Sequence, residues 1–371
     1  MTEKYDGRGS SFKNLGGTCY LNSALNSLFA CKDFVNYFTS GQWKKETQGQ
    51  VRRNKKNKNM PLSDVNKIIV DEYIINVMCQ IITVYFSKPI SNIDLSSKVD
   101  RICKFFNDPC SEINEKGKRI NTGKFRIDSQ QDSNELITTL LLKLHNETRS
   151  KYKFTYDFTQ PETLLFNESV ERYYTAFESG YYSEIYKIFG FQTIESYMNG
   201  TNVLANNFNI ENNCVLSFSP TDVPTTIYDL FDFNFNNQFV PDDTKLNDVV
   251  VQTGTTKTLR FWTVPKVLII QLLRFIDRSR KNETNITVPL ILNVAKYKHE
   301  SYPQDKLDYH LVSIVYHTGT LDFGHYIAYV KHSESWFVHD DSVITPIETQ
   351  SVKYFENNDS FTPYVLFYIR I

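Results

Sequence analysis

Apolar residues in the first 150 positions recur at the intervals of helices. Those that follow Cys19 are spaced as on one face of a helix: Leu21, Leu25, Leu28 and Phe29. Similar spacing predicts one long helix over 64–86, a weaker one over about 96–107 and another over 130–145. Because polar residues separate these positions, we expect amphipathic helices throughout this part of the chain.

The pattern changes to that of strands towards the C-terminus. Residues 264–275 form a nearly continuous apolar run, which is typical of a central strand with both faces buried. Residues 310–317 and 325–332 are strand-like and joined by a loop containing Gly, which predicts a hairpin. Two further strands are expected, at 335–338 and 364–369.

The middle of the chain, between about 150 and 260, has weak periodicity and is rich in Tyr, Phe and Asn. We find no internal repeat, and no linker rich in Pro or Ser separates this part from its neighbours. The simplest interpretation is one α+β domain with a helical lobe, a β-rich lobe and an insertion between them.

Composition excludes several classes of protein. A hydrophobic share of 41% in 371 residues is enough for a sizeable core, and no apolar stretch is long enough to span a membrane. The formal net charge of -1 gives no overall field that would attract nucleic acid. Six cysteines without a pairing framework and a polar N-terminus without a signal-peptide core indicate a reducing compartment. We therefore expect an intracellular protein, cytoplasmic or nuclear, that acts as a monomer and binds neither nucleic acid nor membranes.

A basic run without hydrophobic periodicity occupies residues 51–58. Such runs are most often solvated loops, and we expect a loop here. A nuclear-localisation patch is the alternative.

Cys19 stands where a Gly-rich turn gives way to the first expected helix. A thiol at a helix N-terminus faces unpaired backbone N–H groups and the positive end of the helix dipole, and both favour the thiolate. Gly16 and Gly17 leave room for a substrate backbone to approach the sulfur. The pattern indicates a nucleophile, although a single cysteine in such a place is more often a packing residue. A phosphatase-type cysteine is not expected, because no phosphate-binding Arg follows it.

A cysteine nucleophile needs a histidine base within hydrogen-bond reach and a third group that orients the base. His325 stands at the start of an expected strand, where its ring can extend towards a facing helix. If residues 332–335 form the next hairpin loop, His325 lies opposite residue 342. Asp340 is then its diagonal neighbour on the same face of the sheet, close enough to meet it. We predict that Asp340 accepts from one ring nitrogen while the other faces Cys19. Alone, the histidine and the aspartate would be explained as edge and turn residues.

Five segments resemble, in order, the sequence boxes of the ubiquitin-specific proteases, a family of papain-like cysteine deubiquitinases. They are the Cys box at 14–23, the Gln box at 130–136, the strand at 264–275, the His box at 309–342 and the terminal strand at 364–368. The resemblance implies a papain-like fold with a helical thumb, a β-rich palm and a fingers insertion. The expected parts are a tail at 1–10 and a catalytic domain at 11–371, without an accessory domain. Within that domain we expect the thumb at about 11–150, the fingers insertion with part of the palm at about 150–260, and the palm at about 261–371.

The resemblance also implies roles for single residues. It makes Cys19 the nucleophile, His325 the base and Asp340 the group that orients it. Asn14 would donate a hydrogen bond to the tetrahedral oxyanion, a contribution often worth about 3–4 kcal/mol. Asp341 matches a second acidic position that supports the site in some members, and it could substitute for Asp340. The implied reaction is hydrolysis of the isopeptide or peptide bond after the C-terminal Gly-Gly of ubiquitin, through an acyl-enzyme.

Three residues match positions that hold the extended C-terminal tail of ubiquitin: Gln130, Asp132 and Glu135. A helix cap is the alternative for Asp132, which precedes Glu135 by three residues, and the two roles are compatible.

The chain departs from the family pattern in the fingers, where many members bind zinc through two Cys-x-x-Cys pairs. Ser196 and Asn199 stand at the expected sulfur positions of the first pair, so we expect no zinc and no other cofactor. The fingers should then be short or held together by aromatic residues. This departure leaves open a substrate other than ubiquitin that also ends in Gly-Gly. An inactive ubiquitin-binding scaffold is a further alternative, which the presence of all three residues of the Cys-His-Asp set disfavours.

Overall fold

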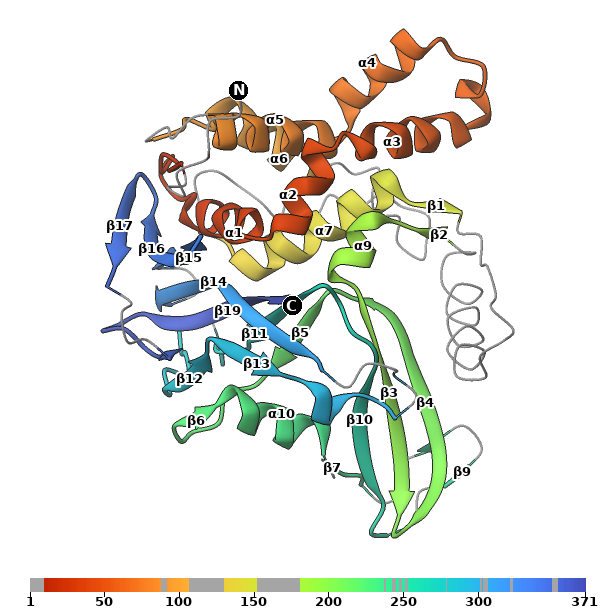
Figure 1. Cartoon of the computed structure of the whole chain (residues 1–371), viewed down its shortest axis with the longest axis vertical. Helices are drawn as coiled ribbons and strands as arrows, with labels where there is room; N and C mark the ends of the chain where they lie inside the picture. Colours follow the sequence, from red (N-terminus) through yellow and green to blue (C-terminus); the bar gives the residue numbers. More distant parts are fainter. Residues whose placement is uncertain are drawn as a thin grey trace.

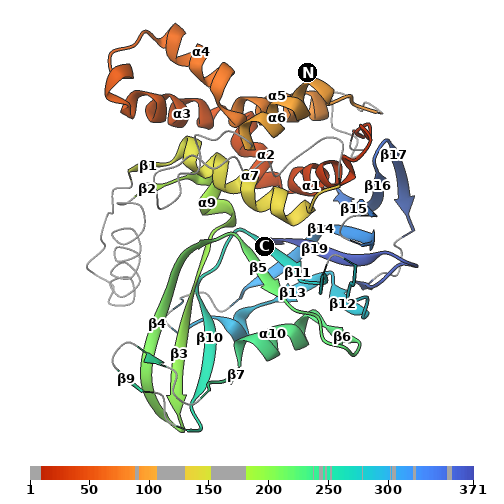
Figure 2. The same cartoon turned by 180° about the vertical axis from the view of Figure 1, so that it is seen from behind.

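A computed structural model describes residues 10–87, 92–106, 130–151, 181–236, 238–241, 245–246, 249–250, 253–277, 279–300, 302, 306–320, 323–348 and 353–371. Helices gather at one end, a large sheet lies beside them, and a long β-ribbon extends from the opposite end (Figures 1 and 2). These parts correspond to the thumb, palm and fingers expected for the α+β fold. Among the described helices none alone is long and apolar enough to cross a membrane.

The thumb consists of α1 (Cys19–Phe29), α2 (Lys32–Thr39), α3 (Gln42–Arg53), the short η1 (Lys55–Asn57), α4 (Leu62–Glu72), α5 (Ile74–Ser87), α6 (Ser96–Phe106) and α7 (Ser133–Thr148). The helices predicted after Cys19, near 96–107 and over 130–145 are confirmed as α1, α6 and α7. The loop expected at 51–58 is wrong at its start, because α3 continues to Arg53. Val51 lies on the buried side of this helix together with Trp43 and Thr47. Five of the six cysteines are free thiols, and Cys110 lies outside the described residues.

The single long helix expected over 64–86 is wrong, because the chain turns a corner there. The axes of α4 and α5 differ in direction by 78°. Together the two helices have the length and apolar composition of a membrane span, but only as a bent pair. Tyr73 between them is extended, with φ -117° and ψ 130°. The carboxylate of Glu147, on α7, accepts from the backbone N–H groups of Ile74 at 3.0 Å and Ile75 at 2.9 Å. This distant side chain caps α5 and therefore stabilises a helix start that local periodicity does not reveal.

Replacing Glu147 by Ala is expected to lower the free energy of unfolding by about 2–5 kcal/mol, because two buried N–H groups lose their acceptor. Urea unfolding followed by circular dichroism measures this. Glu147→Gln keeps one acceptor oxygen and should lose less. An unchanged unfolding midpoint in Glu147→Ala would show that the corner is held by something else.

The palm is built on a sheet in the order β17-β16-β15-β14-β19-β11-β5, with β13 also paired to β14. The strands are β5 (Val215–Phe218), β11 (Val267–Leu272), β13 (Ile291–Asn293), β14 (Asp308–Gly319), β15 (Gly324–His332), β16 (Ser335–Asp340), β17 (Val343–Ile347) and β19 (Thr362–Arg370). All five strands predicted in this part are confirmed, as β11, β14, β15, β16 and β19, and β11 lies inside the sheet between β19 and β5.

Both faces of β11 and β19 are buried, which explains their continuous apolar runs. On β11, Val267 and Ile269 pack with the thumb helices, whereas Leu268 and Ile270 pack into a second core with α10 (Ile227–Phe235). From Val365 to Ile369, the residues of β19 alternate between the two cores in the same way. Alternation of side chains across a strand therefore joins the thumb and the palm through one sheet.

Shorter elements complete the described chain: β1 (Ser150–Lys151), β2 (Tyr181–Tyr182), α9 (Glu184–Phe189), β6 (Thr225–Thr226), β8 (Lys245–Leu246), β9 (Val249–Val250), β12 (Ile286–Pro289), η2 (Ala295–Tyr297) and β18 (Tyr354–Phe355).

The fingers are a sheet in the order β4-β3-β10-β7, formed by β3 (Phe191–Asn199), β4 (Asn202–Asn213), β7 (Gln238–Phe239) and β10 (Thr256–Thr263). Strands of 9 and 12 residues show that the fingers are not short. One carboxylate joins three side chains across the sheet, because Glu195 accepts from the Tyr197 hydroxyl, the Asn207 amide and the Lys257 ammonium.

Ser196 lies on β3 and pairs with β4 and β10, in a part of the fingers that backbone pairing and the contacts of Glu195 hold together. That zinc is not bound there stays a prediction.

Candidate active site

Cys19 is the first residue of α1 and is 2% exposed. The turn before it contains Gly16 with φ +108°, a conformation that side chains with a Cβ rarely adopt. The helix expected here is present, but every residue of α1 is buried, so its polar side does not face solvent as that of a surface amphipathic helix would. Polar residues of α1 are buried because they have partners on other elements. The Tyr85 hydroxyl donates to Asn26 at 3.0 Å, and the hydroxyls of Ser313 and Ser27 are 2.9 Å apart.

Asn14 closes the turn that leads to Cys19. Its side-chain carbonyl accepts from the backbone N–H groups of Gly16 at 2.9 Å and Thr18 at 3.3 Å. Its amide nitrogen donates to Asp341 at 2.8 Å. An amide nitrogen carries two hydrogens, so this contact uses one of them. The side chain is therefore held from both ends beside the helix start.

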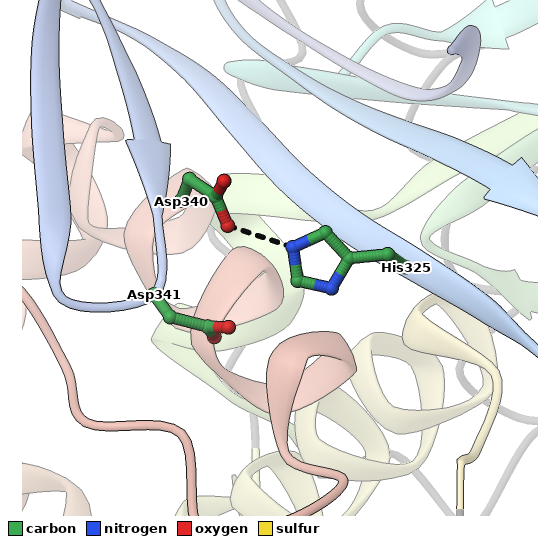
Figure 3. A group of neighbouring side chains, drawn as sticks. All are labelled: His325, Asp340 and Asp341. Carbon is green, nitrogen blue, oxygen red and sulfur yellow. Dashed lines mark hydrogen bonds and ion pairs between the residues drawn. The ribbon is translucent and has the colours of Figure 1, made fainter. Parts of the chain in front are cut away.

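His325 and Asp340 meet as predicted. The distance between His325 Nε2 and Asp340 Oδ1 is 2.7 Å, and Figure 3 shows this carboxylate facing the ring. In the hairpin, His332 is paired with Ser335 and Ala328 with His339, which is the predicted register. The second ring nitrogen, Nδ1, remains for Cys19.

Cys19 and Asp340 both stabilise the protonated ring of His325. A hydrogen-bond interaction with Cys19 is the largest cause that raises the pKa of His325 to about 9, burial opposes it, and Asp340 adds to it. A histidine with this pKa holds its proton at neutral pH. The arrangement can therefore place an imidazolium beside Cys19.

Gly324, which precedes His325, has no room for a side chain. A Cβ built there would lie 2.3 Å from His317 Nε2 and 2.4 Å from the Thr318 carbonyl. His317, on the neighbouring strand β14, is fully buried. Burial is the main reason that the pKa of His317 falls to about 3. The close approach of two neighbouring strands at this point sets where His325 leaves the sheet.

Asp341 is not directed at His325 in the way Asp340 is. It lies at the turn between β16 and β17 with φ +49°, and its oxygens accept from the amides of Asn14 at 2.8 Å and Asn22 at 2.7 Å. Its backbone carbonyl accepts from Phe12 N–H at 3.2 Å. Because Asp340 pairs with the ring while Asp341 holds two amides on other elements, we no longer expect Asp341 to replace Asp340. It instead joins the hairpin to the turn and the helix that carry Cys19.

The residues expected to bind the ubiquitin tail lie beside this cluster. The side-chain amide of Gln130 pairs with both the N–H and the C=O of Gly324. Asp132 caps α7 by accepting from the N–H groups of Asn134 at 2.7 Å and Glu135 at 3.0 Å, and it also accepts from the Tyr364 hydroxyl. The capping role of Asp132 is thus confirmed, whereas tail binding stays a prediction for all three residues.

One group of side chains could also hold a metal ion. Ligand atoms of His325, Asp340 and Asp341 lie within 4.8 Å of one another. The same atoms already have partners, because Asp340 faces the imidazole and Asp341 accepts from two amides. Hydrogen bonding between side chains therefore accounts for this arrangement.

The family model described as "Ubiquitin carboxyl-terminal hydrolase" matches residues 10–368. The chain belongs to this family. Ubiquitin carboxyl-terminal hydrolase 7 of Saccharomyces cerevisiae is 37% identical over 127 residues, which are 32% of this chain and 11% of that protein. The probable ubiquitin carboxyl-terminal hydrolase 8 of Schizosaccharomyces pombe is 37% identical over 100 residues, 26% of this chain and 21% of that protein. The matches thus cover a small part of these relatives' length.

Solved structures of the SAGA DUB module share the fold. The SAGA DUB module Ubp8/Sgf11/Sus1/Sgf73 bound to ubiquitin aldehyde is similar over 100% of this chain and 71% of that chain, with 19% identity and a TM-score of 0.64. The yeast module with a mutant Sgf73 gives 19% identity and a TM-score of 0.65. At such identities the likeness shows the fold alone.

The sequence does not reveal two partners in this site. Asn22 on α1 donates to Asp341, and Tyr364 on β19 donates to Asp132. Both lie inside segments that resemble family boxes, but nothing in those segments indicates which residue each one contacts. Only the fold brings each pair together.

Proposed function

We propose that this chain is a thiol protease that hydrolyses the bond after the C-terminal Gly-Gly of ubiquitin. The observation that carries the proposal is the position of His325, with one ring nitrogen 2.7 Å from Asp340 and its pKa raised chiefly by Cys19. Membership of the ubiquitin carboxyl-terminal hydrolase family supports the choice of substrate.

In the proposed reaction, Cys19 Sγ attacks the carbonyl carbon of the terminal glycine. His325 holds the proton and gives it to the leaving amine as the carbon–nitrogen bond breaks, and a thioester with Cys19 remains. The neutral imidazole then takes a proton from water, whose oxygen attacks the thioester carbon. The carbon–sulfur bond breaks, Cys19 leaves as the thiolate, and the ubiquitin carboxylate is released. Asp340 keeps the ring oriented and stabilises its charged form in both steps.

Asn14 is the proposed donor to the oxyanion of the tetrahedral intermediates. One of its amide hydrogens is used by Asp341, which leaves the other for this oxygen. A donor held in place before the reaction needs little reorganisation when negative charge develops, and this is the basis of its effect.

The extended tail of ubiquitin is proposed to lie along Gln130, Asp132 and Glu135. A narrow passage fits two glycines, and Gln130 lies at the backbone of Gly324, next to His325. Because Gln130 already pairs with that backbone, its amide has to exchange partners if a tail strand binds there. We also propose a monomeric intracellular enzyme, although the Ubp8 structures are complexes with Sgf11, Sus1 and Sgf73.

Labelling with ubiquitin vinyl sulfone tests the proposal. The wild type should form a covalent adduct and Cys19→Ala should form none, as judged by intact mass. Adducts only with the vinyl sulfone of another modifier ending in Gly-Gly would assign that modifier as substrate. No adduct with any of these probes would contradict the enzyme proposal and favour the scaffold.

A further inference from the structure

Positive charge is concentrated on one arm of the thumb, although the whole chain has a formal net charge of -1. Residues 42–60 contain seven Lys or Arg and one acidic residue, Glu46. They include α3 and η1, and α3 packs against α4 as a hairpin. Figures 1 and 2 show this hairpin projecting from the thumb on the side away from β16 and β17. We call residues 42–60 the basic arm.

The cations of the basic arm face solvent. Exposed members are Lys44, Lys45, Arg52, Arg53, Lys56 and Lys58. The opposite side of α3 is buried through Trp43, Thr47 and Val51, which fixes the cationic side outwards. A hydrogen bond of 3.0 Å from Gln48 to Asn66 further ties α3 to α4. The charges are thus presented on a folded hairpin and not on a loose segment.

Little on the arm neutralises these charges. Glu46 is turned inwards, where it accepts from the Tyr37 hydroxyl and from Gln42. In the part of the chain that the structure describes, Lys45, Arg52, Lys56 and Lys58 form no ion pair with a carboxylate. Like charges held close together raise the energy of the folded chain, and a bound polyanion would relieve this repulsion.

We propose that the basic arm binds the phosphate backbone of nucleic acid. Amide side chains are interspersed with the cations, at Gln48, Asn54, Asn57 and Asn59. Lysine, arginine and amide side chains contact phosphate and sugar in such complexes. The protein surfaces in these interfaces are polar and strongly positively charged. The expectation of no nucleic-acid binding came from the charge of the whole chain, which averages this local concentration away.

Two other partners fit the arm less well. A specific protein interface has an apolar or aromatic centre, and the only aromatic residue of α3 and η1, Trp43, is 4% exposed. Insertion into a membrane surface requires an exposed apolar helix face, whereas the apolar face of α3 is buried. Leu62 and Val70 are exposed on α4, but they lie outside the arm.

Fluorescence anisotropy with a labelled short DNA duplex tests the proposal at several KCl concentrations. The wild type should bind DNA of any sequence with a Kd of about 10⁻⁴–10⁻⁶ M at physiological salt. For each tenfold increase in salt concentration, log Kd should rise by about 0.9 for every phosphate that the arm neutralises. The arm variant Lys45→Gln, Arg52→Gln, Lys56→Gln, Lys58→Gln should bind at least about tenfold more weakly, with a smaller salt slope.

A matched variant removes four exposed lysines elsewhere: Lys187→Gln, Lys296→Gln, Lys306→Gln and Lys353→Gln. It has the same change in net charge and should bind DNA as the wild type does. Both variants should keep the hydrolysis rate of a fluorogenic ubiquitin conjugate, which shows that they fold. No DNA binding by the wild type, or equal weakening in both variants, would overturn the proposal. Tighter binding to polyglutamate or to phosphatidylserine vesicles than to DNA would assign the arm to that partner and equally overturn it.

Discussion

Replacing His325 by Ala is expected to lower kcat/KM for a fluorogenic ubiquitin conjugate by about 10⁴-fold or more. The imidazole is the proposed base and proton donor, and its loss leaves Cys19 without the group that stabilises its thiolate. His310→Ala is the matched control, because His310 lies near the start of β14, at the far end from the loop beside His325. It should keep nearly full activity. Comparable rates for His325→Ala and the wild type would remove His325 from the mechanism.

The pH dependence of the same reaction distinguishes this role from a structural one. Interaction with Cys19, opposed by burial and aided by Asp340, raises the pKa of His325 to about 9. A raised histidine pKa means that the ion pair is present below this pH and is lost as the pH rises through it. We therefore expect kcat/KM to fall on the alkaline side near pH 9. In Asp340→Ala the fall should move to lower pH, because the contribution of Asp340 is gone, and an unmoved alkaline limb would argue against this pairing.

The pairing of His325 with Asp340 could be predicted because the position of the loop alone determines which residues of a hairpin lie opposite each other. Once a loop at 332–335 is assumed, alternation along the two strands determines which residues share a face. The observed pairing of His332 with Ser335 fulfils that assumption. The continuous apolar run of β11 was equally informative, since only a strand buried on both faces needs it.

Contacts between distant segments could not be predicted in this way. The corner between α4 and α5 depends on Glu147, which is 73 positions away from Ile74. The apolar residues on both sides of Tyr73 continue one helical period, so periodicity alone predicts a single helix. The burial of α1 is a similar case, because its polar residues look like a solvent face until partners such as Tyr85 and Ser313 are in place.

The role of Asp341 also depends on such contacts. Its neighbour Asp340 is the residue that faces His325, and the sequence offers two adjacent carboxylates without indicating which does what. The structure separates them by direction: one faces the imidazole, and the other accepts from Asn14, a residue 327 positions away. Two adjacent residues on a tight turn thus contact different proposed catalytic groups: Asp340 contacts the base, His325, and Asp341 contacts the oxyanion donor, Asn14.

Replacing Asp341 by Ala is therefore expected to lower kcat by about 10²–10³-fold, the size of effect seen when one oxyanion donor is lost. Without this carboxylate, the amides of Asn14 and Asn22 lose their acceptor and Asn14 is free to rotate away from the oxyanion. Because the ground-state contacts to ubiquitin are kept, KM should change much less than kcat. Steady-state kinetics with a fluorogenic ubiquitin conjugate separates the two parameters.

Asp341→Asn provides a graded comparison, since an amide at this position keeps one acceptor oxygen and can hold one of the two asparagines. Its kcat should lie between those of the wild type and Asp341→Ala. Asp359→Ala is the matched control, because Asp359 also has a positive φ, of 51°, but lies in an exposed turn. If Asp341 acted only by stabilising its turn, Asp341→Asn would behave like the wild type and the loss in Asp341→Ala would follow its unfolding free energy. A loss of kcat in a variant that unfolds at the same urea concentration as the wild type is what positioning of the oxyanion donor requires.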